Sequence, residues 1–237
     1  MTDKPDKNDK KPKLGQRLQC AAELVRSGAF VADVGTDHAY LPIALMLDGE
    51  ICGGVVTDIH TGPIERAREN ICRYGLLDQL TPICCDGLAA EECRRAEDIF
   101  ILGMGGELIA GILSRAPWTK KEGIRLILQP MTHAELLRKF LLEQGYSILC
   151  ERLVSEDRIY QVIHAEYSGE TCDYTPLELL LGKENLSRRE DPFTRELVCR
   201  WERIFCERRE GTRSGGADTD EEDRYLQEIG EWKYDGS

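Results

Sequence analysis

Three aspartates follow three successive apolar runs of the sequence, each near the point where a predicted strand ends. Asp33 lies in VADVGTD, Asp58 in GVVTDI and Asp86 in ICCDGL. In an open parallel sheet, ligands bind outside the carboxyl ends of the strands, where the strand order reverses. One aspartate in such a place is often only a cap for the next helix, but three in register predict a carboxylate-lined crevice.

The loops around these aspartates indicate what the crevice binds. The first turn reads GTDH instead of the G-x-G-x-x-G that brings backbone close to a pyrophosphate, and there is no G-K-[ST] motif. A carboxylate after the second strand can accept hydrogen bonds from ribose hydroxyls. One after the third can accept a hydrogen bond from an adenine amino group. A nucleoside without phosphate that carries a cationic group fits this pattern, and S-adenosylmethionine has that form.

Strands and helices alternate from Leu14 to about Ser168, and these elements must position the aspartates. The β-rich runs are AFVADVG, ICGGVVTDI, LTPICCDG, EDIFILGMGG, GIRLILQP, YSILCERLV and RIYQVIHAEY. Such alternation predicts βαβ units and a mostly parallel sheet. Only SED separates the last two runs, which is too short for a helical crossover, so we expect an antiparallel pair at one edge of the sheet.

Helix signals lie between the runs. The segment 63–74 begins with a proline and ends before Gly75, a residue suited to a helix C-terminus. Segments 107–115 and 133–144 follow the glycines of GMGG and Pro130. We predict a helix over each of the three.

The sequence after residue 168 is polar and helical. Two apolar stripes recur at spacings of three and four residues, formed by Phe193, Leu197, Trp201 and Ile204, and by Tyr225, Ile229 and Trp232. They predict a helical hairpin packed as an antiparallel coiled coil, or else the last 20 residues form a disordered acidic tail. We therefore divide the chain into a flexible charged tail (1–13), an α/β domain (14–168) and a helical domain with an acidic end (169–237).

Composition restricts the class of protein. Ten cysteines occur without a C-x-x-C pair, the N-terminus is charged without an apolar leader, and no apolar run approaches the length of a membrane span. The four histidines show no ligand spacing, and no G-x-S-x-G occurs. We expect a cytoplasmic protein with reduced thiols, no metal and no membrane contact.

The motifs together resemble a known family. The segments RLQCAAELVRSGAFVADVGTDHAYLPIAL, TDIHTGPIERARENICRYGL, CDGL, FILGMGGELIAGIL and RLILQP closely resemble the bacterial tRNA (adenine-N1)-methyltransferases that modify the adenine at position twenty-two of tRNA, often called TrmK. The resemblance runs from about Arg17 to the C-terminal hairpin. It implies an α/β, Rossmann-like class I methyltransferase fold with S-adenosyl-L-methionine as cofactor. It also implies a C-terminal coiled coil that helps to hold tRNA, and we expect a monomer.

The resemblance also assigns residues to the cofactor. It implies that Asp33 and Gly35 begin the cofactor loop and that Asp58 holds the ribose, with Ile59 also in the cofactor site. Gly105 and Gly106 would keep the pocket floor open to an incoming base. The remaining contacts, for the adenine and for the methionine end, fall to Asp86, Gly87, Leu88, Gly103 and Met104.

A carboxylate near the target base would assist methylation of a ring nitrogen. N1 of adenine is already nucleophilic, so the enzyme mainly aligns it and excludes water. The product is cationic, and Asp37 is the candidate to stabilise that charge or accept a proton from the N6 amino group. We expect His38 and Tyr40 to orient or stack the base. In the alternative, Asp37 is a cap and the two rings only pack at a helix start.

The formal charge of −12 argues against a nucleic-acid partner until it is divided by segment. Residues 183–213 hold nine Lys and Arg against seven acids, whereas residues 214–237 hold two against eight. The resemblance makes tRNA the partner, and we expect phosphate contacts from Arg17, Arg26, Arg188, Arg189, Arg195 and Arg200. The Arg-rich helix is otherwise a solvated charged face.

Two other functions remain open. The chain could be a class I methyltransferase for a small molecule or protein, or a catalytically silent RNA-binding module on the same fold. The three aspartates argue against the silent module. Enzymes that methylate exocyclic amines carry a [DN]-P-P-aromatic motif where this chain has GMGG, which favours a ring nitrogen as the target.

Overall fold

The structure of the protein is a computed structural model that describes residues 11–214 and 217–234. Most of the predicted charged tail, residues 1–10, lies outside the described residues. The last residues of the predicted acidic end, 235–237, lie outside them as well.

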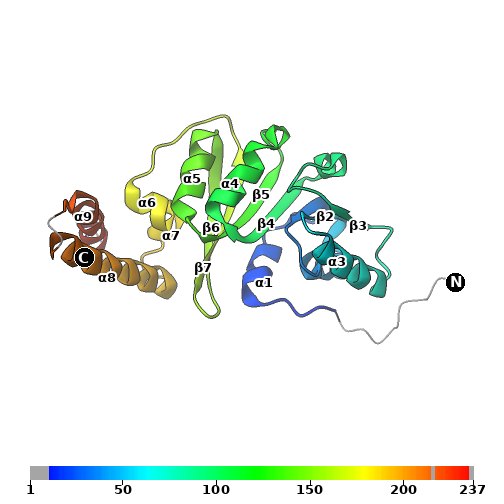
Figure 1. Cartoon of the computed structure of the whole chain (residues 1–237), viewed down its shortest axis with the longest axis horizontal. Helices are drawn as coiled ribbons and strands as arrows, with labels where there is room; N and C mark the ends of the chain where they lie inside the picture. Colours follow the sequence, from blue (N-terminus) through cyan, green and yellow to red (C-terminus); the bar gives the residue numbers. More distant parts are fainter. Residues whose placement is uncertain (1–10, 215–216, 235–237) are drawn as a thin grey trace. The chain divides into compact units, whose positions relative to one another are not determined.

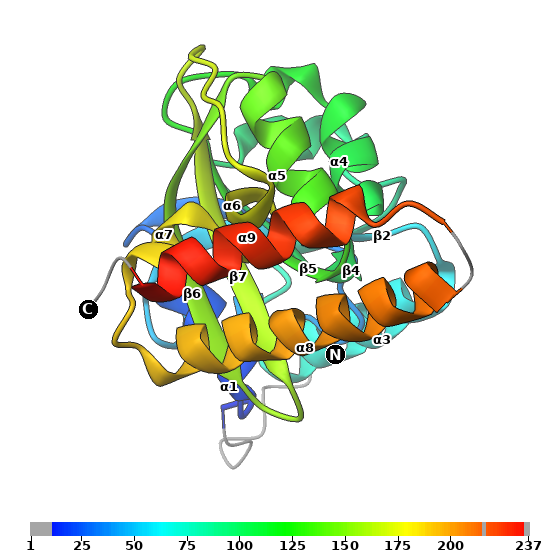
Figure 2. The same ribbon diagram turned by 90° about the vertical axis from the view of Figure 1, so that its left-hand side faces the viewer.

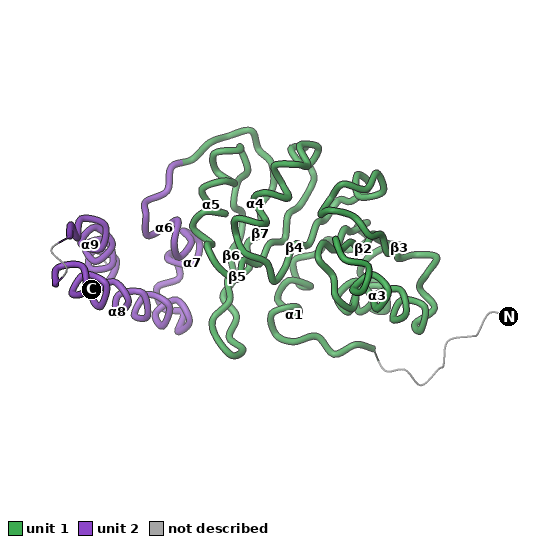
Figure 3. Tube along the Cα trace, viewed as in Figure 1, with its two compact units in different colours: residues 1–172 green, residues 173–237 purple. Residues whose placement is uncertain are grey.

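The chain divides into two compact units, coloured green and purple in Figure 3. Unit 1 spans residues 1–172 and unit 2 spans residues 173–237. The sequence places the corresponding boundary at residue 168.

Unit 1 alternates strands and helices along the chain (Figure 1). Its elements are α1 (Gln16–Ala22), β1 (Ala29–Val34), α2 (Tyr40–Leu47), β2 (Ile51–Asp58), α3 (Thr61–Arg73), β3 (Leu80–Cys84), the 3₁₀ helix η1 (Glu91–Arg95), β4 (Asp98–Gly105), α4 (Gly106–Ser114), the 3₁₀ helix η2 (Pro117–Thr119), β5 (Arg125–Thr132), α5 (Ala134–Glu143), β6 (Tyr146–Ser155) and β7 (Ile159–Tyr167).

In the part of the chain that the structure describes, seven strands form one sheet in the order β3-β2-β1-β4-β5-β7-β6. Strands β1 to β5 pair in parallel, and β7 runs antiparallel to both of its neighbours. The predicted antiparallel pair at one edge is confirmed, with β6 outermost and β7 between β6 and β5.

The strand order reverses between β1 and β4. From β1 the chain moves outward to β2 and β3, and from β4 it moves in the other direction to β5. Because parallel crossovers are right-handed, α2 and α3 cover one face of the sheet and α4 covers the other. The point of reversal is where an open α/β sheet binds its ligand.

The predicted helices are present with small shifts. Segment 63–74 is α3, which begins two residues earlier and ends before Gly75, whose φ of 69° completes the helix end. Segments 107–115 and 133–144 are α4 and α5, and His133 precedes α5 in a left-handed conformation. The sequence analysis predicted neither α1 nor α2, although Pro42 in the first turn of α2 and Gly49 just after its end, with a φ of 73°, form the same signal.

The central strands are buried on both faces, as parallel strands in α/β proteins usually are. Ile99, Phe100 and Ile101 in β4 and Leu126 and Ile127 in β5 each have no exposed surface. This explains the continuous apolar runs that predict the strands.

Unit 2 is helical. Its elements are α6 (Pro176–Leu181), α7 (Lys183–Ser187), α8 (Pro192–Ser214) and α9 (Asp220–Tyr234). Figure 2 shows α8 and α9 side by side as a hairpin. The Phe205 and Tyr225 rings stack across it with centroids 4.3 Å apart, and Ile229 is fully buried. The buried stripe of α8 is wider than the sequence predicts, because Val198 and Phe205 are buried together with Leu197.

Gly106 begins α4 in a space without room for a side chain. A Cβ on Gly106 would lie 2.1 Å from the carbonyl oxygen of His133 and 3.1 Å from that of Thr132. Gly106 therefore lets α4 pack against the turn after β5, rather than keeping a pocket floor open.

We expect Gly106→Ala to lower the free energy of unfolding by about 1–3 kcal/mol or more, because the backbone must move to admit the methyl group. Urea denaturation followed by circular dichroism measures the change. Gly111→Ala in the same helix is the matched control. Its added Cβ would meet only the end of the Arg115 side chain at 3.4 Å, so it should be neutral or stabilising by about 0.5–1 kcal/mol. Equal effects of the two substitutions would contradict the packing argument.

Candidate active site

The three aspartates lie at the carboxyl ends of three neighbouring strands of the sheet. Asp33 is the penultimate residue of β1, and Asp58 is the last residue of β2. Asp58 pairs in register with Cys84, so Asp86 follows directly beyond the end of β3. None of the helical segments that follow β1, β2 and β3 has a side-chain cap at its N-terminus, so these aspartates do not serve as helix caps.

A cavity of about 220 Å³ opens beside β1, lined by the end of the strand, the following loop and Arg17. The loop turns at Gly35, whose φ is 76° and whose Cβ would lie 1.9 Å from Cε of Met104. The backbone N–H groups of Gly35 and Thr36 both donate to the Thr57 carbonyl, at 2.7 and 3.1 Å. The loop is thus fixed to β2, and its first position requires glycine.

Asp33 is a buried carboxyl at the base of this cavity, with 7% of its surface exposed. Burial raises the pKa of Asp33 to about 6, and a hydrogen bond from the Thr36 side chain opposes the rise. A cation placed in the cavity would favour the charged carboxylate. Asp33 is therefore suited to a positively charged ligand group.

Asp37, His38 and Tyr40 lie together at the cavity. Nε2 of His38 is 3.1 Å from the Asp37 carboxylate, and the His38 and Tyr40 rings stack with centroids 5.0 Å apart. The Arg66 guanidinium hydrogen-bonds Asp37, through Nε at 3.0 Å and also through Nη2, and this contact lowers the pKa of Asp37. Asp37 is thus an exposed carboxylate that stays charged beside a pair of stacked rings.

Helix α3 holds this loop through two residues that the sequence analysis missed. Arg66 binds Asp37, and the buried Asn70 donates from Nδ2 to the His38 carbonyl at 3.0 Å. The two residues are four positions apart and so share one face of the helix. Polar side chains at that spacing on a helix next to the crevice are the signal that could have found them.

The other two aspartates, Asp58 and Asp86, have hydrogen-bond partners that a ligand can replace. Oδ1 of Asp58 accepts from the His60 backbone N–H at 2.8 Å, and Ile59 between them is 60% exposed. Oδ1 of Asp86 lies 3.0 Å from Nη2 of Arg115, in a pair about half exposed on both sides. Such surface pairs contribute little, so a ligand that donates to Asp86 can displace Arg115.

Two glycines near the carboxyl ends of β3 and β4 have positive φ angles. Gly87 has a φ of 59°, and its Cβ would lie 2.8 Å from Ile112; its carbonyl accepts from the Thr57 hydroxyl at 2.9 Å. Gly103 has a φ of 76°, and its Cβ would lie 3.3 Å from Nη1 of Arg17. A side chain at either position would strain the backbone.

Arg17 lies inside the crevice. Nη1 donates to Oε1 of Gln129 at 2.7 Å, and the guanidinium lies 5.6 Å from the centre of the Tyr160 ring. Its backbone N–H donates to Glu156 at 2.7 Å. The guanidinium is thus fixed beside Gly103 and within the cavity that Asp33 lines.

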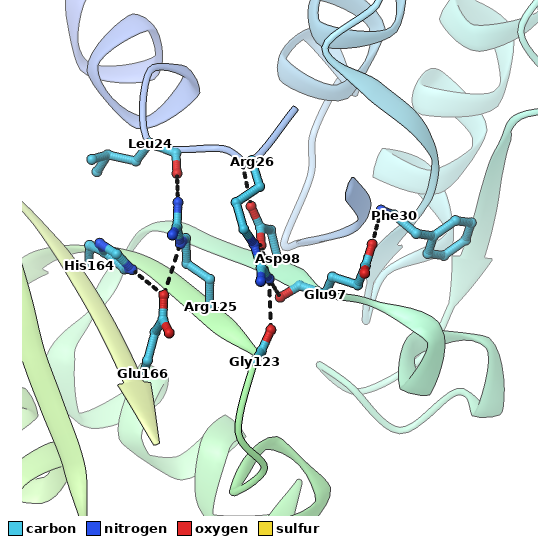
Figure 4. A network of polar contacts seen from close by, with 9 residues as sticks. All are labelled: Leu24, Arg26, Phe30, Glu97, Asp98, Gly123, Arg125, His164 and Glu166. Atoms are coloured by element: carbon cyan, nitrogen blue, oxygen red, sulfur yellow. Dashed lines mark hydrogen bonds and ion pairs between the residues drawn. The ribbon is translucent and has the colours of Figure 1, made fainter. Parts of the chain in front are cut away.

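Arg26 lies elsewhere, before the start of β1 and at the amino ends of the strands, as part of the network in Figure 4. It donates from Nε at 2.7 Å to the fully buried carboxylate of Asp98, and also to the carbonyls of Glu97 and Gly123. The expectation that Arg26 contacts tRNA phosphate does not fit this place, because it neutralises a buried charge. Removing one partner of such a pair costs about 3–5 kcal/mol.

The other expected RNA contacts lie in unit 2. Arg188 and Arg189 precede α8, where Nη2 of Arg188 donates to Asn185 at 2.6 Å. Arg195 and Arg200 are exposed on α8. These four arginines therefore gather near the beginning of that helix.

Within the described ranges, no helix has both the length and the apolar character to cross a membrane. No group of three or more His, Cys, Asp and Glu side chains there could hold a metal ion.

Comparison with known proteins agrees with this geometry. Residues 14–163 match a family described as a methyltransferase domain. A tRNA (adenine(22)-N(1))-methyltransferase of Bacillus subtilis (strain 168) is 38% identical over 173 residues, which are 72% of each chain.

Solved structures are similar over nearly the whole chain. The B. subtilis m1A22 tRNA methyltransferase TrmK has 32% identity over 92% of this chain and 95% of its own, with a TM-score of 0.78. A Streptococcus pneumoniae protein in complex with S-adenosyl-L-methionine has 28% identity over 93% and 99%, with a TM-score of 0.81. The expected Rossmann-like methyltransferase fold with C-terminal helices is confirmed.

We expect Asp33→Asn to change how stability depends on pH. The pKa of Asp33 is raised in the folded state, so the folded state binds the proton more tightly than the unfolded chain. Ionisation of this carboxyl therefore lowers the free energy of unfolding as pH rises from about 4 to 6. Two pKa units correspond to about 3 kcal/mol. In urea denaturation at several pH values, the variant should gain stability relative to wild type across this window and hold the gain above it. A difference that does not vary with pH would contradict the assignment.

Proposed function

The chain belongs to the family of tRNA (adenine(22)-N(1))-methyltransferases, and on that premise we propose that it transfers the methyl group of S-adenosyl-L-methionine to N1 of adenine 22 in tRNA, giving 1-methyladenosine. The observation that carries the proposal is the crevice at the switch point, with Asp33, Asp58 and Asp86 at its strand ends and the Asp37, His38 and Tyr40 group at its cavity. As part of the proposal the enzyme is a cytoplasmic monomer.

The residues at the strand ends fit the nucleoside part of the cofactor. Asp58 would accept from the ribose hydroxyls, and the exposed Ile59 side chain offers an apolar surface for the adenine ring. Asp86 would accept from the adenine amino group in place of Arg115, and Gly87 and Leu88 would supply backbone there. When bound, S-adenosylmethionine supplies an electrophilic methyl group on a sulfonium.

Two oppositely charged residues fit the methionine end. The buried Asp33 would pair with the ammonium group, which would also favour its ionised form. Arg17, fixed by Gln129 beside Gly103, would bind the carboxylate, because a guanidinium matches a carboxylate in geometry and charge. We propose this role for Arg17 in place of a phosphate contact, with Gly103 and Met104 completing the site.

The base side of the crevice would act on charge and alignment. The stacked His38 and Tyr40 rings offer a flat surface that would hold the adenine plane. Methylation at N1 leaves the base positively charged, and the Asp37 carboxylate would stabilise that charge. Because Arg66 lowers the pKa of Asp37, this carboxylate stays ionised at neutral pH but is a weak base. Its main contribution is therefore electrostatic rather than proton removal from N6.

The test is incubation of the protein with unmodified tRNA and labelled S-adenosylmethionine, followed by nucleoside mass spectrometry. Wild type should produce 1-methyladenosine at position 22, whereas Asp37→Ala should lose about a hundredfold or more in rate, because the electrostatic stabilisation is lost, and should still bind the cofactor in calorimetry. Asp48→Ala is the matched control, because Asp48 lies at the far end of α2 from Tyr40. Methylation at a different atom or on a non-tRNA substrate would overturn the proposal, and wild-type turnover by Asp37→Ala would remove Asp37 from it.

The role of Arg17 has a separate test. Arg17→Gln should raise the Kd of S-adenosylmethionine about tenfold or more, because a hydrogen-bonded charge partner is lost. The affinity for methylthioadenosine, which lacks the amino-acid carboxylate, should not change. The salt dependence of tRNA binding should stay as in wild type. The reverse result, with a reduced salt dependence and unchanged cofactor affinity, would restore the phosphate assignment.

A further inference from the structure

A second cavity lies in unit 2, between the beginning of α8 and the end of α9. It encloses about 280 Å³, and its lining combines three cationic side chains with an indole ring, an acid and a thiol: Arg189, Arg195, Lys233, Trp232, Glu190 and Cys199. The acid and Arg189 come from the loop before α8, Arg195 and the thiol from α8, and the other two from α9. Two of the arginines expected to contact RNA, Arg189 and Arg195, line this cavity.

Hydrogen bonds hold the aromatic and cationic groups in place. Nε1 of Trp232 donates to the Leu186 carbonyl at 2.8 Å. Nη1 of Arg189 donates to the Trp232 carbonyl at 2.5 Å, and its guanidinium carbon lies 5.5 Å from the indole centre. Nε of Arg195 donates to the Arg189 carbonyl at 2.8 Å. A ligand would therefore meet a largely formed site, which lowers the entropy cost of binding.

The acids beside the cavity leave these cations available. Arg195 lies 2.7 Å from Glu190, in a pair whose side chains are 56% and 88% exposed. Lys233 lies 2.5 Å from Glu202, which does not line the cavity. Exposed pairs contribute little, so an anion with better geometry can replace the acids.

The charge of the hairpin differs between its two ends. The first turn of α9 is acidic, and its Asp223 pairs with both Arg209 and Arg213, at 3.2 and 3.4 Å. The cavity lies at the other end of α9, where Lys233 joins Arg189 and Arg195. Among the residues that line the cavity, three cations therefore stand against one acid, Glu190.

We propose that this cavity binds one phosphate of an RNA backbone and that the Trp232 indole contacts the sugar or base attached to it. The proposal rests on tRNA being the substrate and adds a defined contact far along the chain from the crevice residues. A guanidinium can bind two phosphate oxygens at once, as Arg195 would, and Lys233 adds a point charge. Aromatic side chains provide stacking surfaces for nucleotides of any sequence.

The first experiment measures tRNA affinity against salt for Arg195→Gln and for Arg203→Gln, an exposed arginine of the same helix that does not line the cavity. Arg195→Gln should weaken binding severalfold and reduce the slope of log K against log salt by about one. Arg203→Gln should leave the slope as in wild type. Circular dichroism, which reports the helices of unit 2, checks that both variants are folded. Equal slopes for both variants would overturn the proposal, because they would indicate a diffuse charged surface.

The second experiment uses the unmodified protein. Cys199 lines the cavity and Cys52 is exposed on β2. Iodoacetamide labelling followed by mass spectrometry should show that tRNA protects Cys199 and leaves Cys52 reactive. Unchanged labelling of Cys199 at saturating tRNA would also overturn the proposal.

Two further comparisons distinguish an RNA phosphate from a free phosphate, and the cavity assignment from the proposed methyltransferase function. Adenosine monophosphate or inorganic phosphate at the concentration of the tRNA should not protect Cys199. Protection by either would mean that the site binds a free anion rather than an RNA backbone. If wild type methylates tRNA but the slopes of the two variants coincide, the cavity assignment fails alone. If Cys199 is protected but tRNA is not methylated, the proposed function fails and the cavity assignment stands.

Discussion

The parallel pairing of β1 with β2 on one side and with β4 on the other is the constraint on which the crevice depends. It places the carboxyl ends of these strands side by side, so that Asp33, Asp58 and the glycines at the end of β4 lie close together. The Gly35 turn then fixes the next loop by two hydrogen bonds to the Thr57 carbonyl. Because side chains alternate between the faces of a strand, a shift of β1 by one residue would turn Asp33 to the other face of the sheet.

Contacts at the amino ends of the strands also help to form the crevice at their carboxyl ends. Arg26 neutralises the fully buried Asp98, and Arg125 joins the Leu24 carbonyl to Glu166 (Figure 4). These contacts tie the segment between α1 and β1 to the amino ends of β4 and β5. Helix α1 carries Arg17 into the cavity. Ion pairs at the amino ends of the strands therefore help to position the Arg17 guanidinium at the carboxyl ends. A buried charge pair is weak support for stability, but it fixes where the chain enters the sheet.

The sequence predicts the strands, the antiparallel edge and the place of the three aspartates, because these follow from apolar runs and from the direction of parallel strands. It does not predict the partners of the site residues. Arg66 beside Asp37 and Arg115 beside Asp86 are each 29 residues away along the chain. The spacing of Arg66 and Asn70 indicates a shared helix face, but it does not say which carboxylate that face meets. The same limit applies to Arg26, whose role depends on a buried carboxylate far along the chain. The sequence underestimates the width of the buried stripe on α8, because apolar periodicity assumes that a single neighbouring helix covers it. Thr194 of α8 also binds the carbonyl of Asn185 in α7, so a second helix covers part of α8.

The net charge of −12 has a different meaning once the cations are placed. Several arginines already pair with acids of the protein itself: Arg26 with Asp98, Arg66 with Asp37 and Arg209 with Asp223. An acidic body repels RNA at distance, so non-specific attraction contributes little to affinity. Binding must then come from a few fixed cations that meet phosphates only when the RNA is docked in one orientation. We therefore expect low affinity but a strict orientation, which suits an enzyme that must bring a single adenine to the carboxyl ends of its strands.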